Sequence, residues 1–188
     1  MSSDPRAAAV AGASHLPDPG GAAAVVSGSC SVATQGQVAH WRAAGRPAWR
    51  IDAARCADPG ADPAQEALAW AVPRLGAGPV LVYATSTPEE VRAVQQRYGV
   101  ERAGAVVEGC LARVAAGLVT CGVRRLVVAG GETSGAVVNA LGIDQLRIGP
   151  TMAPGVPWTW APRPGLLLAL KSGNFGAADF FSHALRGG

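Results

Sequence analysis

Three glycine-bearing turns, each following a short apolar run, constrain the fold of this chain more than any other feature. A strand that ends in small residues and then opens a helix leaves backbone N–H groups unpaired and pointing to one spot. The helix dipole favours negative charge there, and glycine lets an anion approach the main chain. We therefore expect a phosphate-bearing ligand at the carboxyl edge of a sheet. The turns are Ser27-Gly28-Ser29-Cys30-Ser31 (turn 1), Gly130-Gly131-Glu132-Thr133-Ser134-Gly135 (turn 2) and Lys171-Ser172-Gly173-Asn174-Phe175-Gly176 (turn 3).

Strand and helix signals alternate around these turns, which predicts an α/β fold: a three-layer α/β/α sandwich with a central, mainly parallel sheet. Residues 1–21 have no apolar periodicity and are expected to be a flexible leader or linker remnant, with one domain over 22–188. A proline-rich loop is expected over 150–164. The expected strands are 22–26, 48–51, 79–83, 126–129, 145–148 and 166–170, and the expected helices are 32–44, 62–75, one opening at 87–90, 103–121, 133–141 and 177–185.

Composition narrows the class of protein. A chain of 188 residues that is 49% apolar and 15% charged is long and apolar enough for one packed domain. Its net charge of +3 comes from scattered residues, without the basic block typical of nucleic-acid binding. The longest apolar runs are expected to fall short of a membrane span, and the N-terminus lacks a signal pattern. We therefore expect a cytoplasmic protein that binds neither nucleic acid nor membrane.

The four cysteines do not indicate a metal or disulfide framework. Cys30, Cys56, Cys110 and Cys121 have no short paired spacing, which excludes the common zinc patterns. Small buried side chains are the simplest interpretation. Cys30 lies inside turn 1, but no histidine lies nearby in the sequence to activate it as a nucleophile.

Turn 2 carries the strongest signal for phosphate binding. Its two adjacent glycines allow a ligand to press against the main chain, Thr133 is expected to cap the following helix, and Ser134 adds a hydroxyl donor. The alternative is a plain tight turn. The run lacks the Gly-Lys-Ser/Thr ending of a Walker loop and does not match the Gly-x-Gly-x-x-Gly dinucleotide fingerprint. In turn 1, Ser29, Ser31 and Thr34 offer hydroxyls around one point, although Ser and Thr are also ordinary helix caps.

Turn 3 begins with Lys171, the one lysine in a chain with 16 basic residues. A compact ammonium beside a phosphate-binding turn acts as a point charge on the phosphoryl group, whereas arginine offers a planar fork. Compositional chance and a surface position are the alternatives. Glu132 and Asp179 are the acidic residues nearest the turns, and each is either a water-mediated magnesium ligand or a capping residue.

At these residues the chain resembles the C-terminal nucleotide-binding domain of the four-carbon acid sugar kinase family. The similarity runs in order from Ala22 to Leu185. Besides turns 1 to 3, it includes Ala33-Thr34, Ala136-Val137-Val138, Leu141-Gly142-Ile143, Gly155-Val156-Pro157-Trp158, Leu168-Ala169-Leu170 and Asp179-Phe180-Phe181.

The resemblance implies an ATP-binding domain of a kinase that phosphorylates sugar acids such as threonate, erythronate or 3-oxo-tetronates, with ATP and Mg²⁺ as cofactors. Ser29 and Ser31 would contact nucleotide phosphate, and turns 2 and 3 would complete the ATP site. The expected cofactor-binding residues are Ser29, Ser31, Thr34, Gly130, Gly131, Glu132, Thr133, Lys171, Gly173, Asn174 and Gly176. No residue is assigned as catalytic base or as metal ligand.

The chain departs from the family in one respect. Family members carry a large N-terminal domain that binds the sugar acid and is expected to supply the base, whereas only about twenty residues precede the first expected strand here. The sugar acid is therefore expected to bind through a domain that this sequence lacks. A non-catalytic nucleotide- or phospholigand-binding module stays open as the alternative function, and a homo-oligomer stays open as the assembly.

Overall fold

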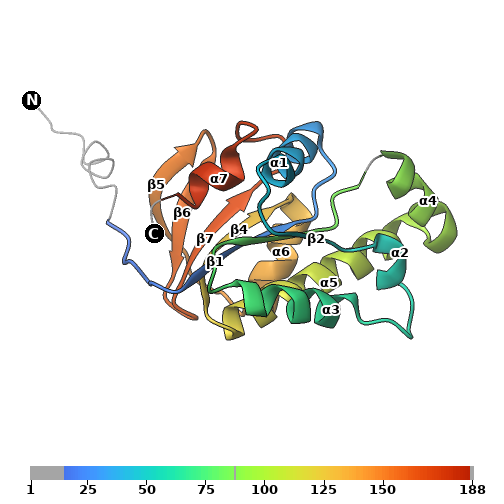
Figure 1. The fold of residues 1–188 in the computed structure, drawn as a ribbon, viewed down its shortest axis with the longest axis horizontal. Coiled ribbons are helices and arrows are strands. Elements are labelled where there is room, and N and C mark those ends of the chain that lie inside the picture. Colours follow the sequence, from blue (N-terminus) through green and yellow to red (C-terminus); the bar gives the residue numbers. More distant parts are fainter. Residues whose placement is uncertain (1–14, 87, 187–188) are drawn as a thin grey trace, which may run out of the picture.

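The computed structural model describes residues 15–86 and 88–186, and these form one seven-stranded sheet with helices on both faces (Figure 1). The strand order is β2-β3-β1-β4-β7-β6-β5. The strands are β1 (Ala22–Ser27), β2 (Ala48–Arg50), β3 (Val80–Tyr83), β4 (Val123–Ala129), β5 (Arg147–Ala153), β6 (Val156–Ala161) and β7 (Leu166–Lys171).

The five strands β2, β3, β1, β4 and β7 run parallel, while β6 and β5 add to β7 in antiparallel fashion. This confirms the prediction of a mainly parallel sheet. All four residues of β3 and five of the six residues of β1 are buried. Such continuous apolar runs are typical of parallel strands that helices cover on both faces.

Two apolar clusters show that the sheet is the middle of three layers. On one face, helices α1 (Val32–Ala43) and α7 (Phe180–Ala184) cover side chains that include Val25 and Val127. On the other face, α3 (Pro63–Ala71), α5 (Val100–Thr120) and α6 (Gly131–Ala140) cover Val26 and Val128. Alternate residues of β1 and β4 thus point to opposite faces, as strand geometry requires. The three-layer prediction is confirmed. The remaining helices are α2 (Ala53–Cys56), the short 3₁₀ helix η2 (Val72–Arg74) and α4 (Pro88–Tyr98).

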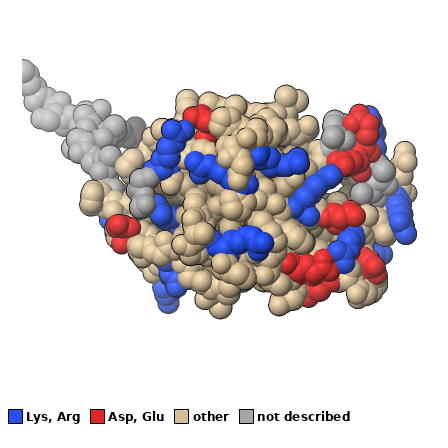
Figure 2. Space-filling view, viewed as in Figure 1, with Lys and Arg blue, Asp and Glu red and all other residues tan. Residues whose placement is uncertain are grey.

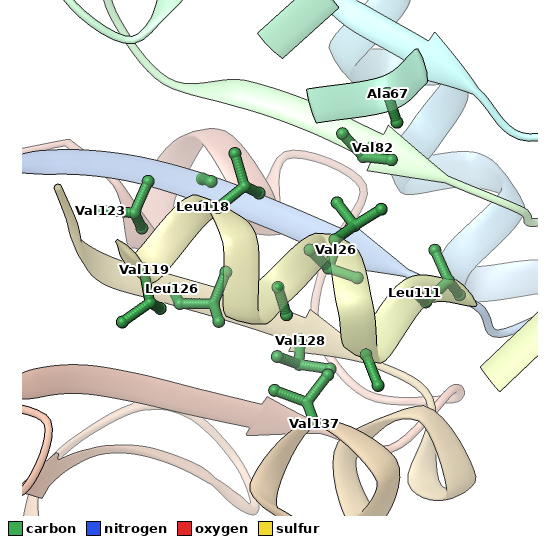
Figure 3. Packing of buried hydrophobic residues seen from close by; sticks show 14 of the residues in the cluster. Val26, Ala67, Val82, Leu111, Leu118, Val119, Val123, Leu126, Val128 and Val137 are labelled. Carbon is green, nitrogen blue, oxygen red and sulfur yellow. The ribbon is translucent and has the colours of Figure 1, made fainter. Parts of the chain in front are cut away.

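Helix α5 forms the centre of the larger cluster. Its Leu111 and Leu118 pack toward Val26 and Leu126 of the sheet (Figure 3). Among the described residues, one helix, α5, has the length and apolar composition that a membrane-spanning helix needs. The expectation that every apolar run is too short for a membrane span therefore needs correction. The apolarity has a structural reason here, because α5 packs between α3, α6 and the sheet.

The prediction of a proline-rich loop over 150–164 is wrong. Strand β5 extends to Ala153, and β6 occupies much of the remainder. The β5–β6 pairing shifts register twice, between Ile148 and Thr151 and again between Thr151 and Ala153. Prolines, which cannot donate to the ladder, are tolerated there because the pairing is already irregular. Gly155, with φ of +74°, allows the tight connection between the two strands.

Other boundaries move by a few residues. The strand predicted at 145–148 begins at Arg147, helix α7 is shorter than the predicted 177–185, and α5 begins at Val100 rather than 103. The expected leader lies partly outside the described residues. Its described part, from residue 15 to 21, has no regular element before β1. The Leu16 side chain nevertheless lies against Gly149 of β5, in the space that a Cβ at Gly149 would need.

Candidate functional site

The three turns meet at one edge of the sheet, because β1, β4 and β7 are adjacent parallel strands whose carboxyl ends lie together. Backbone hydrogen bonds join the turns directly. The N–H groups of Gly28 and Ser29 donate to Ala129 O at 2.9 and 3.2 Å, and Gly130 N–H donates to Lys171 O at 2.8 Å. The expectation that the three turns gather at one edge is confirmed.

A cavity of about 640 Å³ opens at this edge between turn 1 and turn 2. Chain topology explains its position. The connection after β1 leads into α1 on one face of the sheet, and the connection after β4 leads into α6 on the other face. Adjacent strands whose connections leave to opposite faces create a crevice at their carboxyl ends, which is where ligands bind in open α/β sheets. The volume is in the usual range of small-molecule sites.

Turn 2 presents the open N-terminus of α6 to this cavity. Gly130 has φ of +124° and precedes the helix without a side-chain capping bond. The expected capping role of Thr133 is therefore wrong; its buried side chain lies against Gly28 and Gly130 instead. The Ser134 hydroxyl donates to Gly130 O at 2.6 Å, so it is used within the helix. A Cβ at Gly131 would meet no atom within 4 Å, which shows that open space faces this residue.

Turns 1 and 3 are joined through one face of α1. Ser31, Thr34 and Gln37 are three residues apart, so their side chains lie on the same side of the helix. Ser31 Oγ and Thr34 Oγ1 donate to Gly173 O at 2.6 and 2.8 Å. Gln37 Nε2 donates to three successive carbonyl oxygens of residues 175–177 at 3.0 to 3.1 Å. Ser31 also caps α1, accepting from Thr34 N–H at 3.2 Å.

Lys171 lies inside the protein, bonded to turn 3 and to α1. Its side chain is 0% exposed, which excludes the surface alternative. The ammonium donates to Thr34 Oγ1 at 3.1 Å and to the carbonyl oxygens of Ser172 and Gly173 at 3.0 Å each. All three N–H donors are thus used inside the protein, and a phosphate contact would have to displace one of these bonds. Burial lowers the Lys171 pKa to about 8.

The structure divides the predicted site residues into two groups. One group lines the cavity: Ser29, Gly130, Gly131, Glu132 and Thr133. The other group lies beside it and does not line it: Ser31, Thr34, Lys171, Gly173, Asn174 and Gly176. The second group lies in turn 3 or in the α1 residues bonded to it. Their binding of nucleotide stays a prediction.

Several cavity residues were not predicted from the sequence. Arg50, at the end of β2, pairs with Glu90 of α4 at 2.5 Å, and Gln95 of α4 also lines the cavity. Figure 2 shows acidic and basic side chains close together at the end of the molecule that holds α2 and α4. Ser86 lines the cavity as well. A usable signal was present for Arg50 and Ser86, because both lie at or just after the carboxyl end of a predicted strand.

Two carboxylates lie together in the cavity wall. Burial raises the pKa of Glu108 on α5, and a hydrogen bond with Glu132 and its negative charge add to the effect. Asp179, the other acidic residue considered for magnesium, instead pairs with Arg186 at 3.3 Å and does not line the cavity. Within residues 15–86 and 88–186, no three His, Cys, Asp or Glu side chains form a metal-binding group. A metal ion here would need ligand oxygens from water or from a bound substrate.

Known proteins match the chain over most of its length. Residues 24–181 match the family model described as the nucleotide-binding C-terminal domain. A 3-oxo-tetronate kinase of Cupriavidus necator is 59% identical over 177 residues, which are 93% of this chain and 40% of the relative. A 3-oxo-tetronate kinase of Pseudomonas fluorescens is 56% identical over 174 residues, which are 92% of this chain and 40% of the relative.

A solved structure shows the same fold over most of this chain. A Haemophilus influenzae protein described as a member of the family DUF1537 superposes with a TM-score of 0.81 at 39% identity, covering 88% of this chain and 40% of that one. The chain thus spans about two fifths of the length of the relatives that it matches. Because the family model covers most of the described fold, including all three turns, the chain belongs to the nucleotide-binding C-terminal domain family.

Proposed function

We propose that this chain is the ATP-binding part of a kinase that phosphorylates a four-carbon sugar acid of the 3-oxo-tetronate type. The observation that carries the proposal is the uncapped N-terminus of α6 opening into the cavity beside turn 1. The N–H groups of its first turn have no acceptor within the helix, and they point to a place where phosphate oxygens would accept from them. The substrate class comes from relatives named 3-oxo-tetronate kinase, and a cytoplasmic location is part of the same proposal.

In this proposal the chain contributes by positioning ATP and by stabilising charge on the transferring phosphoryl group. The turn 2 amides and the Ser29 side chain of turn 1 would hold the phosphates. Glu108 and Glu132 would hold Mg²⁺ through water, with phosphate oxygens completing its shell. When bound, Mg²⁺ neutralises developing phosphate charge. The base and the sugar-acid site would belong to the part of the relatives that this chain does not span.

Calorimetric titration of the chain with ATP, ADP and NAD tests the nucleotide site. We expect ATP and ADP to bind and NAD to bind weakly, because the dinucleotide fingerprint is missing from the turns. Binding of NAD without ATP would contradict the proposal. Glu132→Gln should reduce the gain in ATP affinity that Mg²⁺ produces, while leaving metal-free ATP binding in place.

A chimaera tests the reaction. The matched C-terminal part of the Cupriavidus necator relative is replaced by this chain, which is feasible at 59% identity. We expect the chimaera to phosphorylate a 3-oxo-tetronate, and the same chimaera carrying Gly131→Ala to lose most of that activity. A chimaera that binds ATP but transfers no phosphate would favour the alternative, a non-catalytic nucleotide-binding module.

A further inference from the structure

A buried cation without a carboxylate partner lies behind turn 1. Lys171 is the chain's one lysine, and its ammonium is bonded to two carbonyl oxygens and one hydroxyl. The described residues include no salt bridge to it, and burial is the cause of its lowered pKa. Burying an ammonium without a counter-charge is costly. An apolar side chain would avoid that cost, but it could not donate to these three oxygen atoms.

A chain of hydrogen bonds leads from this ammonium to the cavity wall. Lys171 Nζ donates to Thr34 Oγ1, and Thr34 Oγ1 lies 3.1 Å from Ser31 Oγ. Ser31 Oγ in turn lies 3.2 Å from Ser29 Oγ, and Ser31 N–H donates to Ser29 Oγ at 3.2 Å. Ser29 lines the cavity. The buried charge is therefore connected to the site through three hydroxyl groups.

The charge also sets the direction of these hydrogen bonds. A protonated amine donates three hydrogens and accepts none. Thr34 Oγ1 must then accept from Lys171 and give its own hydrogen to Gly173 O, which it meets at 2.8 Å. A neutral amine has a lone pair and can accept from Thr34 instead, so that Gly173 O loses a donor. Protonation of Lys171 thus keeps turn 3 tied to the N-terminus of α1.

Gly173 has to remain close to turn 1 for this arrangement to exist. A Cβ at Gly173 would lie 2.5 Å from Ser29 Oγ and 2.9 Å from Ser31 Oγ. The absence of a side chain lets three donors reach the same carbonyl oxygen, from Ser31, Thr34 and Lys171. Turn 3 therefore supports turn 1 from behind, while turn 1 faces the cavity.

We propose that Lys171 is a positioning residue for the nucleotide site: its buried positive charge fixes Thr34 and Gly173, and through them the place of Ser29 in the cavity wall. The inference rests on the proposed function for what fills the cavity, but it assigns Lys171 a different role from phosphate contact. The uncompensated charge also adds to the positive potential that the helix N-termini create at this edge.

Other charged and titratable groups lie on the elements around Lys171. Asp179, just before α7, pairs with Arg186, and Glu132 on α6 interacts with Glu108. The remaining groups are His40 and Arg42 on α1, His183 on α7, Arg124 and Arg125 on β4, and the Cys30 thiol of turn 1. With the Lys171 pKa at about 8, the charge is present at pH 7 and is lost as the pH rises further. Nucleotide affinity should fall in the same range.

The uniqueness of Lys171 allows a direct test by NMR. Protein labelled with ¹³C-lysine gives one lysine ε-carbon signal, which should titrate near pH 8 in the ligand-free chain. The Ser29 amide signal should shift with the same midpoint, and Thr34→Val should remove that coupling. Calorimetry at pH 7 and pH 9 should show ATP affinity falling about tenfold, the size of one lost charge-assisted hydrogen bond. Cys30→Ser should keep this pH dependence.

Lys171→Met supplies the matched variant, because its length is similar and its charge is gone. It should bind ATP at pH 7 about as weakly as the wild type does at pH 9, and its affinity should not change with pH in this range. A lysine signal that titrates near 10.5, or ATP affinity that is equal at pH 7 and pH 9, would overturn the inference. If no nucleotide binds at any pH, the proposed function fails, and the Ser29 amide titration still decides whether Lys171 positions turn 1.

Discussion

The N-termini of α1 and α6, which follow the adjacent strands β1 and β4, are built in opposite ways. Ser31 precedes α1, and its side chain caps the helix and also bonds turn 3. Gly130 precedes α6 and has no side chain to cap the helix. The first N-terminus is satisfied within the protein, whereas the second is left for a ligand. A phosphate-type turn in the sequence can therefore be either a binding element or the support behind one.

Side-chain space follows the same division. An added Cβ at Gly173 would collide with the hydroxyls of turn 1, whereas one at Gly131 would meet no atom within 4 Å. Both glycines lie in turns that the family resemblance treats alike. Gly173 is needed because another part of the protein comes close, and Gly131 because an open cavity lies beside it. Substitutions at these positions should consequently separate stability from binding.

The largest expected effect concerns the pH dependence of stability at Lys171. Its folded pKa of about 8 lies below the ordinary 10.5, so between these values the unfolded chain binds more protons than the folded chain. The free energy of unfolding should therefore rise with pH across this window, by on the order of 3 kcal/mol in total. Lys171→Met should lack this rise, which urea unfolding of both proteins at pH 7.5 and pH 10 measures.

The sign makes this prediction useful, because stability and ATP affinity should change in opposite directions above pH 8. Lys171→Met should be at least as stable as the wild type at pH 7, since a buried charge is removed. A variant that loses several kcal/mol of stability but binds ATP normally would show that Lys171 only supports the fold. It would contradict the division between a supporting turn and a binding turn.

Gly173→Ala should give the next largest effect on stability. The new methyl must displace the Ser29 or Ser31 hydroxyl, which breaks the bonds between turns 1 and 3. We expect a loss of about 2 kcal/mol in the free energy of unfolding, typical of overpacking. Gly36→Ala on the exposed side of α1 is the matched control, because a Cβ there meets nothing within 4 Å. Equal stabilities of the two variants would show that the turns are not tightly joined.

Gly131→Ala should reverse that pattern. Its methyl enters the cavity at the N-terminus of α6 and obstructs a phosphate, while the fold accommodates it without collision. ATP affinity should fall about tenfold, or about 1.4 kcal/mol, with little change in thermal stability. Gly135→Ala, in the same helix but outside the cavity, should keep normal ATP binding and gain up to about 1 kcal/mol of stability. Normal ATP binding by Gly131→Ala would place the ligand elsewhere.

The fold could be predicted because local signals and topology agree along most of the chain. Buried apolar runs followed by small residues indicate parallel strands, and β1, β3, β4 and β7 appeared close to the predicted ranges. Strands β5 and β6 were harder, because prolines suppress the strand signal and their tolerance depends on irregular pairing that only the partner strand reveals. For that reason β6 was missed, and β5 was predicted only at its first residues.

The site was only partly predictable because spacing in the sequence does not show which side of a turn a residue faces. Turns 1, 2 and 3 all carry small residues after a strand, yet only the first two line the cavity. Turn 3, with Lys171, packs against Thr34, which lies nearly 140 residues earlier in the chain. The burial of Lys171 depends on that long-range contact. Glu108 lies within a helix whose pattern indicates only packing. Its meeting with Glu132 depends on how α5 and α6 contact each other.

The smallest expected effect concerns the contact between Glu108 and Glu132 in the cavity wall. Burial is the largest cause of the raised Glu108 pKa, and Glu132 adds to it through a hydrogen bond and its charge. Glu132→Gln removes the charge and keeps the shape, so the Glu108 pKa should fall but stay above its ordinary 4.5. Carboxyl ¹³C NMR of glutamate-labelled protein follows this titration, and Glu89→Gln, on exposed α4, is the control that should leave it unchanged. An unchanged Glu108 pKa in Glu132→Gln would mean that burial alone raises it, and that the two carboxylates are too weakly coupled to share a cation.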